Sequence, residues 1–354
     1  TLGTLGYGLP GREVPASHTT PDVVSVHRWL ANMARQGAKA VAMEVSSHAL
    51  TQGRVEGVHF DVAVFTNLTR DHLDYHGSME AYGEAKRALF DAHRPRYAVI
   101  NVDDPFGVQL SARLAGEMQV VRTSLQASEA ELFVQRLECT AEGLLMACAG
   151  RWGAFELNVP LMGRFNAMNV LQAVASVLVC EIPLDVVVQA VRQLQAPPGR
   201  LQQFIFPQGL RVVVDYAHTP DALANALGAL RAHCHGRLRC VFGCGGDRDA
   251  GKRPEMGRVA AEMADDVILT DDNPRSEMPE NIVAQILTGI ASRDLIRVQH
   301  DREQAIRDAL RDAGPDDIVL IAGKGHEDYQ EVTGVRRPFS DIAVVQTCLQ
   351  ELSA

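Results

Sequence analysis

Short apolar runs rich in valine and isoleucine alternate along this chain with longer segments of helical periodicity. This alternation is typical of βαβ units, in which helices connect parallel strands and cover the sheet. The expected strands comprise residues 40–45, 62–66, 97–101, 212–216, 238–242, 266–270 and 317–322. The expected helices comprise residues 78–91, 166–180, 220–232, 254–263, 279–290 and 302–311. The pattern therefore predicts an α/β protein with mainly parallel sheets.

The length of the chain predicts two domains, because 354 residues exceed what one hydrophobic core usually serves. From about residue 131 to 159 the pattern changes to two or three alternating strand-like stretches, which indicates an antiparallel ribbon. The sequence 196–200, Ala-Pro-Pro-Gly-Arg, disfavours both helix and strand. We therefore expect one parallel-sheet domain over residues 1–197 and a doubly wound, Rossmann-like domain over residues 198–354.

The charge of the chain argues against nucleic acid or an anionic membrane surface as a partner. The formal net charge is −10 and the pI is about 5.6, so no basic excess is available to release counterions. The longest apolar stretch, residues 170–180, is interrupted by Gln172 and Ser176 and is shorter than the roughly 20 residues of a spanning helix. The first residues have neither a basic head nor an apolar core, so they do not resemble a signal peptide.

The cysteines favour a reducing cytoplasm. There are 7 of them, scattered and without a C-x-x-C pair. Cys234, Cys240 and Cys244 lie near two histidines, but their spacing matches no standard zinc module. We expect buried or incidental thiols at these positions.

A glycine-rich segment after the expected strand 238–242 invites a nucleotide-binding interpretation. Gly246–Lys252 matches G-x-x-x-x-G-K, but a phosphate loop needs Ser or Thr next, and Arg253 stands there. Pro254 is expected to begin a helix, whose N-terminus together with Arg248 would suit a carboxylate or phosphate. A glycine turn needed only for chain reversal is the alternative. No G-x-G-x-x-G motif bridges a strand and a helix, which argues against a dehydrogenase.

Carboxylates and imidazoles follow two expected strands. They are Glu44 and His48 at the end of the first strand, and Asp71, His72, Asp74 and His76 beyond the second. Strand ends are where ligands bind in parallel sheets, so magnesium binding or proton handling is plausible chemistry, with a solvated polar turn as the alternative. Lys86, taken by itself, is a solvent-facing helical lysine.

Six ordered motifs together resemble the Mur ligase family, over nearly the whole chain. They are Glu44-Val-Ser-Ser-His48, the run 66–76, Gly163-Arg-Phe-Asn-Ala-Met-Asn169, Asp215-Tyr-Ala-His-Thr-Pro220, Asp272-Asn-Pro-Arg275 and Gly323-Lys-Gly-His-Glu-Asp-Tyr-Gln330. Within the family, the chain is most similar to members that add meso-2,6-diaminopimelate to UDP-N-acetylmuramoyl-L-alanyl-D-glutamate in peptidoglycan synthesis. The resemblance implies ATP and Mg²⁺ as cofactors, an acyl phosphate formed on the dipeptide's glutamate, and attack by the diaminopimelate amine. It also implies a cytoplasmic monomer.

The resemblance also assigns roles to individual residues. Those matched to the UDP-muramoyl substrate are Thr19, Thr20, Ser46, Gln52 and Arg54. Those matched to magnesium are Glu44, His72 and Lys86, the last as a carbamylated lysine, and the same three are the expected catalytic group. Those matched to ATP are Asn166, Arg200 and Asp215. Those matched to diaminopimelate are Arg248, Asp272, Asn273, Pro274, Arg275, Gly323 and Glu327.

Two of these assignments carry a specificity argument. Arg275 can pair bidentately with the distal carboxylate of diaminopimelate, a group that lysine lacks. Glu327 can accept hydrogen bonds from the distal ammonium. Arg275 therefore favours a diaminopimelate enzyme over a lysine-adding or folylpolyglutamate-type relative.

The sequence departs from the family pattern at its start. The family's Gly-Thr-Asn-Gly-Lys-Thr phosphate loop does not occur within these 354 residues. The resemblance therefore implies a first domain that lacks a strand and a helix of its mononucleotide-binding sheet, and residues 1–354 alone are expected to hydrolyse ATP poorly. A non-catalytic module that keeps only the amino-acid pocket is the rival interpretation.

Overall fold

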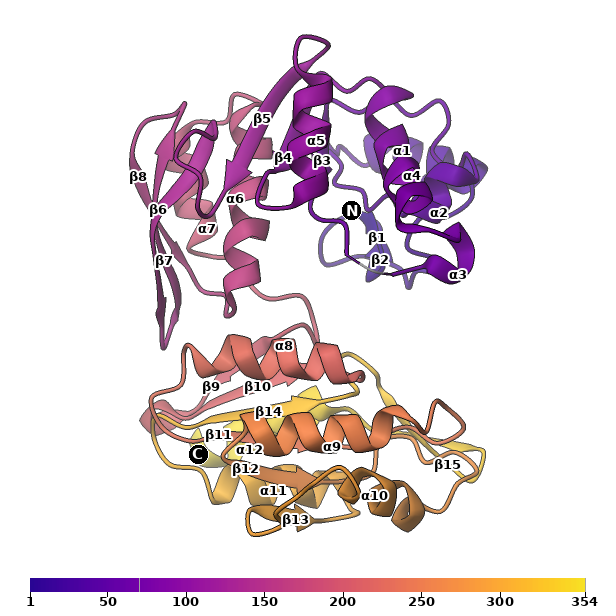
Figure 1. The fold of residues 1–354 in the computed structure, drawn as a ribbon, viewed down its shortest axis with the longest axis vertical. Coiled ribbons are helices and arrows are strands. Elements are labelled where there is room, and N and C mark those ends of the chain that lie inside the picture. The colour runs from indigo at the N-terminus through magenta and orange to yellow at the C-terminus, as the bar shows by residue number, and fades with distance from the viewer. Residues whose placement is uncertain (70, 354) are drawn as a thin grey trace. The chain divides into compact units, whose positions relative to one another are not determined.

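Two six-stranded sheets form the framework of the computed structural model, which describes residues 1–69 and 71–353 (Figure 1). One compact unit comprises Thr1–Gln135, Cys148–Phe155 and Met168–Val187, and the other comprises Arg136–Ala147, Glu156–Ala167 and Val188–Ala354. The α/β class expected from the sequence is confirmed. The single boundary after residue 197 stays a prediction, because the units interleave along the ribbon that follows Gln135.

The first sheet has the strand order β3-β4-β5-β6-β7-β8. Its strands are β3 (Val62–Phe65), β4 (Tyr97–Asn101), β5 (Gln119–Ser124), β6 (Leu132–Thr140), β7 (Gly143–Gly150) and β8 (Phe155–Val159). The pairs β3–β4, β4–β5 and β5–β6 are parallel. The ribbon expected from residue 131 onward is present as β6, β7 and β8. Apolar side chains of β3 and β4 pack against α4 (Met79–Asp91) and α5 (Pro105–Leu114) in one buried cluster.

Further strands and helices surround this sheet. They are β1 (Leu2–Gly3), β2 (Gly6–Tyr7), α1 (Val23–Arg35), α2 (Ser47–Thr51), α3 (Leu73–His76), α6 (Arg164–Leu178) and α7 (Leu184–Val191). Asp22, Ser46, Ser78 and Asp104 each accept a backbone N–H at a helix start, which satisfies donors that have no partner inside the helix. Of these elements α6 was predicted, as a helix over residues 166–180, whereas the others were not, and several of them are too brief to show a period.

The strand expected over residues 40–45 is not formed. Met43 makes one isolated parallel bridge with Leu2, through hydrogen bonds from the Leu2 N–H to the Ala42 carbonyl and from the Glu44 N–H to the Leu2 carbonyl. The partner strand β1 has only two residues, so no longer ladder can form along this segment. Val41 is consequently exposed.

The second sheet has the strand order β13-β12-β11-β14-β10-β9. Its strands are β9 (Gln202–Ile205), β10 (Arg211–Asp215), β11 (Leu238–Phe242), β12 (Asp266–Leu269), β13 (Ile296–Val298) and β14 (Ile318–Ala322). All neighbours are parallel except β9, which is antiparallel to β10. Successive strand residues belong to opposite cores, as the two-residue period of a strand requires.

Helices cover both faces of this sheet. Val213, Leu320 and their neighbours pack with α8 (Pro220–Arg231), α9 (Lys252–Met263) and α10 (Pro279–Leu287), whereas Val212 and Val319 pack with α11 (Arg302–Arg311) and α12 (Asp341–Ser353). Helix α9 begins at Lys252, so Pro254 is its third residue and not its first as expected. A proline is tolerated there because N–H groups of the first turn have no partner within the helix. A short 3-10 turn, Pro207–Gly209, joins β9 to β10.

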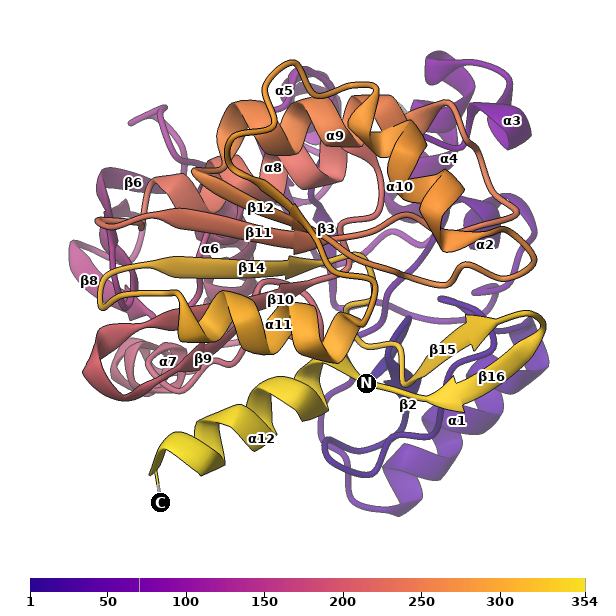
Figure 2. The ribbon, with the colours of Figure 1, turned by 90° about the horizontal axis from the view of Figure 1, so that it is seen from below.

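A two-stranded hairpin follows β14. Its strands are β15 (Tyr329–Val332) and β16 (Val335–Pro338), which pair antiparallel. Figure 2 shows this hairpin on the side toward which the parallel strands point. The hairpin therefore adjoins the sheet edge where ligands bind in doubly wound folds.

Candidate active site

The parallel strands of the second sheet bring most of the expected amino-acid-binding residues to one edge. Asp215 ends β10, the glycine segment 243–246 follows β11, residues 270–275 follow β12, and residues 323–327 follow β14. These strands are neighbours in the order β12-β11-β14-β10. The topology thus gathers, from segments far apart in the sequence, side chains that a single motif could not supply.

A buried lysine joins two of the expected side chains. Lys324 is fully buried, and its Nζ donates to Asn273 Oδ1 at 3.0 Å and to Glu327 Oε2 at 3.1 Å. Asn273 Nδ2 donates to the same Glu327 oxygen at 3.0 Å, and the Glu331 N–H donates to Asn273 Oδ1 at 2.9 Å. The sequence analysis assigned no role to Lys324, although this lysine lies within the motif that begins at Gly323.

Arg275 is fixed through its backbone. Its φ is 53°, its N–H donates to the Glu331 carbonyl at 3.0 Å, and its carbonyl accepts from the Thr333 N–H at 2.7 Å. Its guanidinium Nη1 donates to the Gly246 carbonyl at 2.7 Å. A Cβ on Gly246 would lie 1.9 Å from the Pro274 carbonyl oxygen, so this close approach requires glycine. Pro274 thereby serves the pocket through its backbone.

Asp272 is a buried residue in the segment that follows β12 at this edge. The carboxylate is buried, and burial raises its pKa, against the opposing effects of Arg302 and Lys324. Gly323 has a φ of 116°, and a Cβ there would lie 2.6 Å from Asp272 Oδ2. Glycine is therefore needed both for the backbone conformation and for contact with the carboxylate. Arg248, by contrast, is exposed, and its Nη1 donates to the carbonyl of the neighbouring Asp247 at 3.5 Å.

The residues expected to contact the nucleotide have structural partners of their own. Asp215 accepts from the Leu201 and Ala217 N–H groups, each at 2.8 Å, and burial raises the pKa of its carboxyl. The Arg200 guanidinium lies 5.2 Å from the centre of the Tyr216 ring. Asn166 donates to the Met162 carbonyl at 2.7 Å near the start of α6.

The glycine-rich segment is not a triphosphate loop. Arg253, at the position where such a loop has Ser or Thr, is fully buried. Its guanidinium donates to both carboxylate oxygens of Glu277 at 2.8 Å, to Gln285 Oε1 at 2.8 Å and to the Gly245 carbonyl at 3.1 Å. This side chain therefore ties the segment to the loop before α10 and leaves no hydroxyl for magnesium.

The five residues matched to the UDP-muramoyl substrate form one connected network in the other unit. Thr20 Oγ1 donates to the Glu44 carbonyl at 2.8 Å and accepts from the Ser46 N–H at 3.1 Å. Arg54 donates to the Thr20 carbonyl at 2.9 Å and, through two nitrogens, to Gln52 Oε1 at 2.9 and 2.6 Å. The Thr19 hydroxyl lies 2.9 Å from that of Thr4, which in turn donates to Glu44 Oε2 at 2.7 Å.

A groove of about 700 Å³ lies beside this network. Gln52 and Arg54 line it together with Tyr7, His18 and Trp29. An arginine and an amide beside the rings of His18 and Trp29 provide donors for an anion and an apolar surface for a sugar or base. The groove is therefore chemically suited to a nucleotide-sugar.

The Lys86 amine lies over the ring of Tyr82, which in turn packs against two imidazole rings. Its Nζ lies 4.9 Å from the centre of the Tyr82 ring, and that ring is 6.0 Å from the His72 ring and 5.1 Å from the His76 ring. Burial lowers the pKa of the Lys86 amine, against the opposing effects of nearby Asp71 and a second aspartate. The solvent-facing lysine expected from sequence physics alone is thus half-buried. Arg70, within the same motif, lies outside the described residues.

Two of the three residues matched to magnesium carry donor atoms that suit the ion as they stand. Glu44 offers an oxygen and His72 a nitrogen, but the amine of Lys86 is not itself a magnesium ligand. Within residues 1–69 and 71–353, no group of three or more His, Cys, Asp or Glu side chains is placed to hold a metal ion. A carbamate on Lys86 would supply the missing oxygens.

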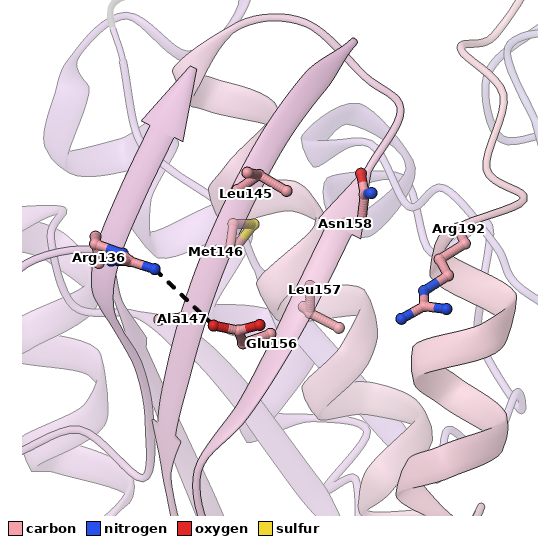
Figure 3. A pocket seen from close by; sticks show the side chains of 8 residues that line it. All are labelled: Arg136, Leu145, Met146, Ala147, Glu156, Leu157, Asn158 and Arg192. Atoms are coloured by element: carbon pink, nitrogen blue, oxygen red, sulfur yellow. Dashed lines mark ion pairs between the residues drawn. The ribbon is translucent and has the colours of Figure 1, made fainter. Parts of the chain in front are cut away.

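A smaller cavity of about 220 Å³ lies on the ribbon of β6, β7 and β8 (Figure 3). It is lined by Leu145, Met146 and Leu157. Arg136 and Glu156, which also line it, form an ion pair in which Nη2 and Oε1 lie 3.9 Å apart. None of the expected site residues lines it.

All seven cysteines are free thiols. Within the part of the chain that the structure describes, no helix is long and apolar enough to cross a membrane.

Comparisons with known proteins agree with this arrangement. Residues 1–177 match the family described as Mur ligase middle domain, and residues 199–325 match Mur ligase, glutamate ligase domain. The UDP-N-acetylmuramoyl-L-alanyl-D-glutamate--2,6-diaminopimelate ligase of Pseudomonas aeruginosa is 50% identical over 351 residues, which cover 98% of this chain and 71% of the relative. The protein of the same name from Alkalilimnicola ehrlichii is 50% identical over 355 residues, which cover 100% of this chain and 71% of the relative.

A solved structure of a ligase with that name superposes with a TM-score of 0.80 at 40% identity, covering 99% of this chain and 72% of the other. The likeness thus extends over both units of the fold and over every motif named from the sequence. The chain belongs to the Mur ligase family.

Proposed function

We propose that the protein carrying this chain joins meso-2,6-diaminopimelate to UDP-N-acetylmuramoyl-L-alanyl-D-glutamate with ATP, in peptidoglycan synthesis. The substrate assignment depends on one observation, namely that Arg275 and Glu327 are fixed at the same sheet edge. The β15–β16 hairpin holds Arg275 through its backbone, and Asn273, which is bonded to the same hairpin, holds Glu327. A guanidinium and a carboxylate at one edge complement the distal carboxylate and ammonium of diaminopimelate. The names of the relatives support the same substrates.

The reaction divides into two steps that the two candidate sites would serve. The glutamate carboxylate of the dipeptide takes the terminal phosphoryl group of ATP, and ADP leaves. The neutral amine of diaminopimelate then attacks the acyl carbon, and the tetrahedral intermediate loses a proton from nitrogen and expels phosphate as the amide forms. The network of Thr20, Gln52 and Arg54 would hold the UDP-muramoyl part, and Arg275 and Glu327 would hold the far end of the amino acid.

Magnesium, when bound, would neutralise charge that develops on the transferring phosphoryl group. Glu44, His72 and a carbamate on Lys86 would hold it. Carbamylation requires the neutral amine, and burial of Lys86 favours that form by lowering its pKa. Arg200 and Asp215, with Asn166, would contact the nucleotide. We place the reaction in the cytoplasm of the cell, catalysed by a monomer.

The test is phosphate release by the complete gene product that carries these residues, with ATP, the dipeptide substrate and either diaminopimelate or lysine. Release with diaminopimelate alone is expected. Arg275→Ala should raise the KM for diaminopimelate roughly 100-fold with little change in the KM for ATP, because a bidentate charged pair is lost. Arg258→Ala, on the exposed face of α9, is the matched control.

Two outcomes would contradict the proposal. Equal loss of diaminopimelate and ATP use in Arg275→Ala would remove the assigned pocket. A folded protein that releases phosphate with neither amino acid would favour the rival binding-only module.

A further inference from the structure

Glu327 has one carboxylate oxygen engaged and one available. Oε2 accepts from both Lys324 and Asn273 Nδ2, at 3.1 and 3.0 Å. Within residues 1–69 and 71–353, no group donates a hydrogen bond to Oε1. An oxygen without a protein partner, on a carboxylate whose other oxygen is fixed, is suited to accept from a ligand.

Lys324 also decides how the Asn273 amide is oriented. Oδ1 of Asn273 accepts from the Lys324 ammonium and from the Glu331 N–H, two groups that can only donate. The Nδ2 group must therefore point toward Glu327. Without the lysine, one donor alone would hold the amide, and the amide could turn.

In this cluster the carboxylates outnumber the cationic side chains by one, so the cluster can accept one further positive charge. Lys324 Nζ is 4.0 Å from Asp272 Oδ1, and the neighbouring Arg302 is paired with Asp341. Three carboxylates, including Glu327, thus surround two buried cations. The ammonium of Lys324 is fully enclosed, so it does not itself meet a substrate.

We propose that Lys324 is a positioning residue for amino-acid selection, which orients Asn273 and Glu327 so that Glu327 Oε1 receives the distal ammonium of the amino-acid substrate. This inference rests on the proposed function, in which Glu327 meets that ammonium. Lys324 acts through Glu327 and not on the reacting amine or on the phosphoryl group.

The experiment compares Lys324→Met with wild type in the complete gene product, using diaminopimelate and 2-aminopimelate as alternative substrates. The second compound keeps the distal carboxylate but has no distal amine. We expect Lys324→Met to raise the KM for diaminopimelate roughly 10- to 100-fold, while the KM for 2-aminopimelate and for ATP stays within about threefold. Lys39→Met, at an exposed lysine, is the matched control.

A double-mutant cycle with Glu327→Gln separates positioning from a merely structural role. Because Lys324 acts through Glu327, Lys324→Met should add little to the KM increase in the Glu327→Gln background. The proposal is overturned if the two increases multiply, or if the KM for both amino acids rises equally. Lys324→Gln, which keeps a donor without the charge, is the second variant and should give an intermediate KM.

The remaining outcomes are also decisive. If neither Lys324 variant folds, the lysine is structural and the inference fails. If wild type uses neither amino acid, the proposed function fails, whatever the variants do. If wild type uses diaminopimelate and Lys324→Met does so with an unchanged KM, only the role of Lys324 is refuted.

Discussion

Replacing Arg253 by serine would complete the G-x-x-x-x-G-K-S pattern that begins at Gly246, yet we expect it to destabilise the fold without creating a nucleotide site. The reason is that Arg253 is fully buried and makes four hydrogen bonds, two of them to the Glu277 carboxylate. Serine is too short to reach Glu277 or Gln285. The substitution therefore leaves a carboxylate and an amide without their donor.

The expected loss follows from the exposure of the two partners. Removing one member of a buried ion pair costs about 3–5 kcal/mol. Glu277 is 30% exposed, so water can solvate it in part, and we expect about 2–4 kcal/mol. The lower helix propensity of serine adds about 0.5 kcal/mol. For a domain of this size each kcal/mol lowers Tm by about 2–4 °C, which gives a decrease of about 5–18 °C.

The assay is differential scanning calorimetry of Arg253→Ser beside Arg258→Ser. Both arginines lie on α9, but Arg258 forms an exposed pair with Glu262, whose side chains are 55% and 57% exposed. Exposed pairs of this spacing contribute about 0.3–0.5 kcal/mol, and the helix propensity of serine costs about 0.5 kcal/mol here too, so the control should lose no more than about 4 °C. Equal shifts in the two variants, or tight ATP binding by Arg253→Ser, would refute the reasoning.

Acid titration provides a second check with a definite sign. The hydrogen bond from Arg253 lowers the pKa of Glu277 from 4.5 to about 2. A carboxyl with a depressed pKa stabilises the folded state above its ordinary pKa and loses this contribution as the pH falls from about 4.5 toward 2. In Arg253→Ser that contribution is absent. The Tm difference between wild type and variant should therefore narrow over this interval.

Two further predictions concern the buried ion pair of Asp341 and the amine of Lys86. Asp341→Ala should lower the free energy of unfolding by about 3–5 kcal/mol, measured by urea titration against the exposed-site control Asp294→Ala, because it leaves Arg302 fully buried without its ion pair. A loss below about 1 kcal/mol would contradict the assigned pair. Lys86→Ala should lose phosphate release and regain part of it with added acetate or another small carboxylate, which would replace the carbamate oxygens. No rescue in a folded variant would argue against carbamylation.

The parts of the fold that the sequence predicted well are the long periodic segments. The strands at 97–101 and 238–242 and the helix at 302–311 were predicted with the observed bounds, because apolar periodicity and capping residues agree there. The segment 40–45 was wrongly predicted as a strand. Its composition suits a strand, but a ladder also needs a partner, and composition says nothing of the partner's length.

The candidate sites show a similar division. Arg275 and Glu327 were predicted from motifs, and their contacts with the hairpin and with Lys324 required the folded chain. The interpretation of Lys86 as a solvent-facing residue failed because helical spacing does not report which rings cover the side chain. Arg253 could be excluded as a phosphate-loop residue from the sequence, but its burial against Glu277 depends on a segment 24 residues away.

The hairpin that holds Arg275 has a consequence for the kinetics of the pocket. An isolated two-stranded hairpin is only marginally stable, and all four residues of β16 are exposed. Main-chain bonds from Arg275 and Thr333 nevertheless link the hairpin to the loop after β12. Transient opening of β15 and β16 would release Arg275 and the Asn273 amide together, so the amino-acid pocket would disassemble as a unit while the sheet beneath stays folded. Hydrogen exchange in β15 should then slow when the amino acid binds, linking substrate capture to the closing of a local, low-stability element.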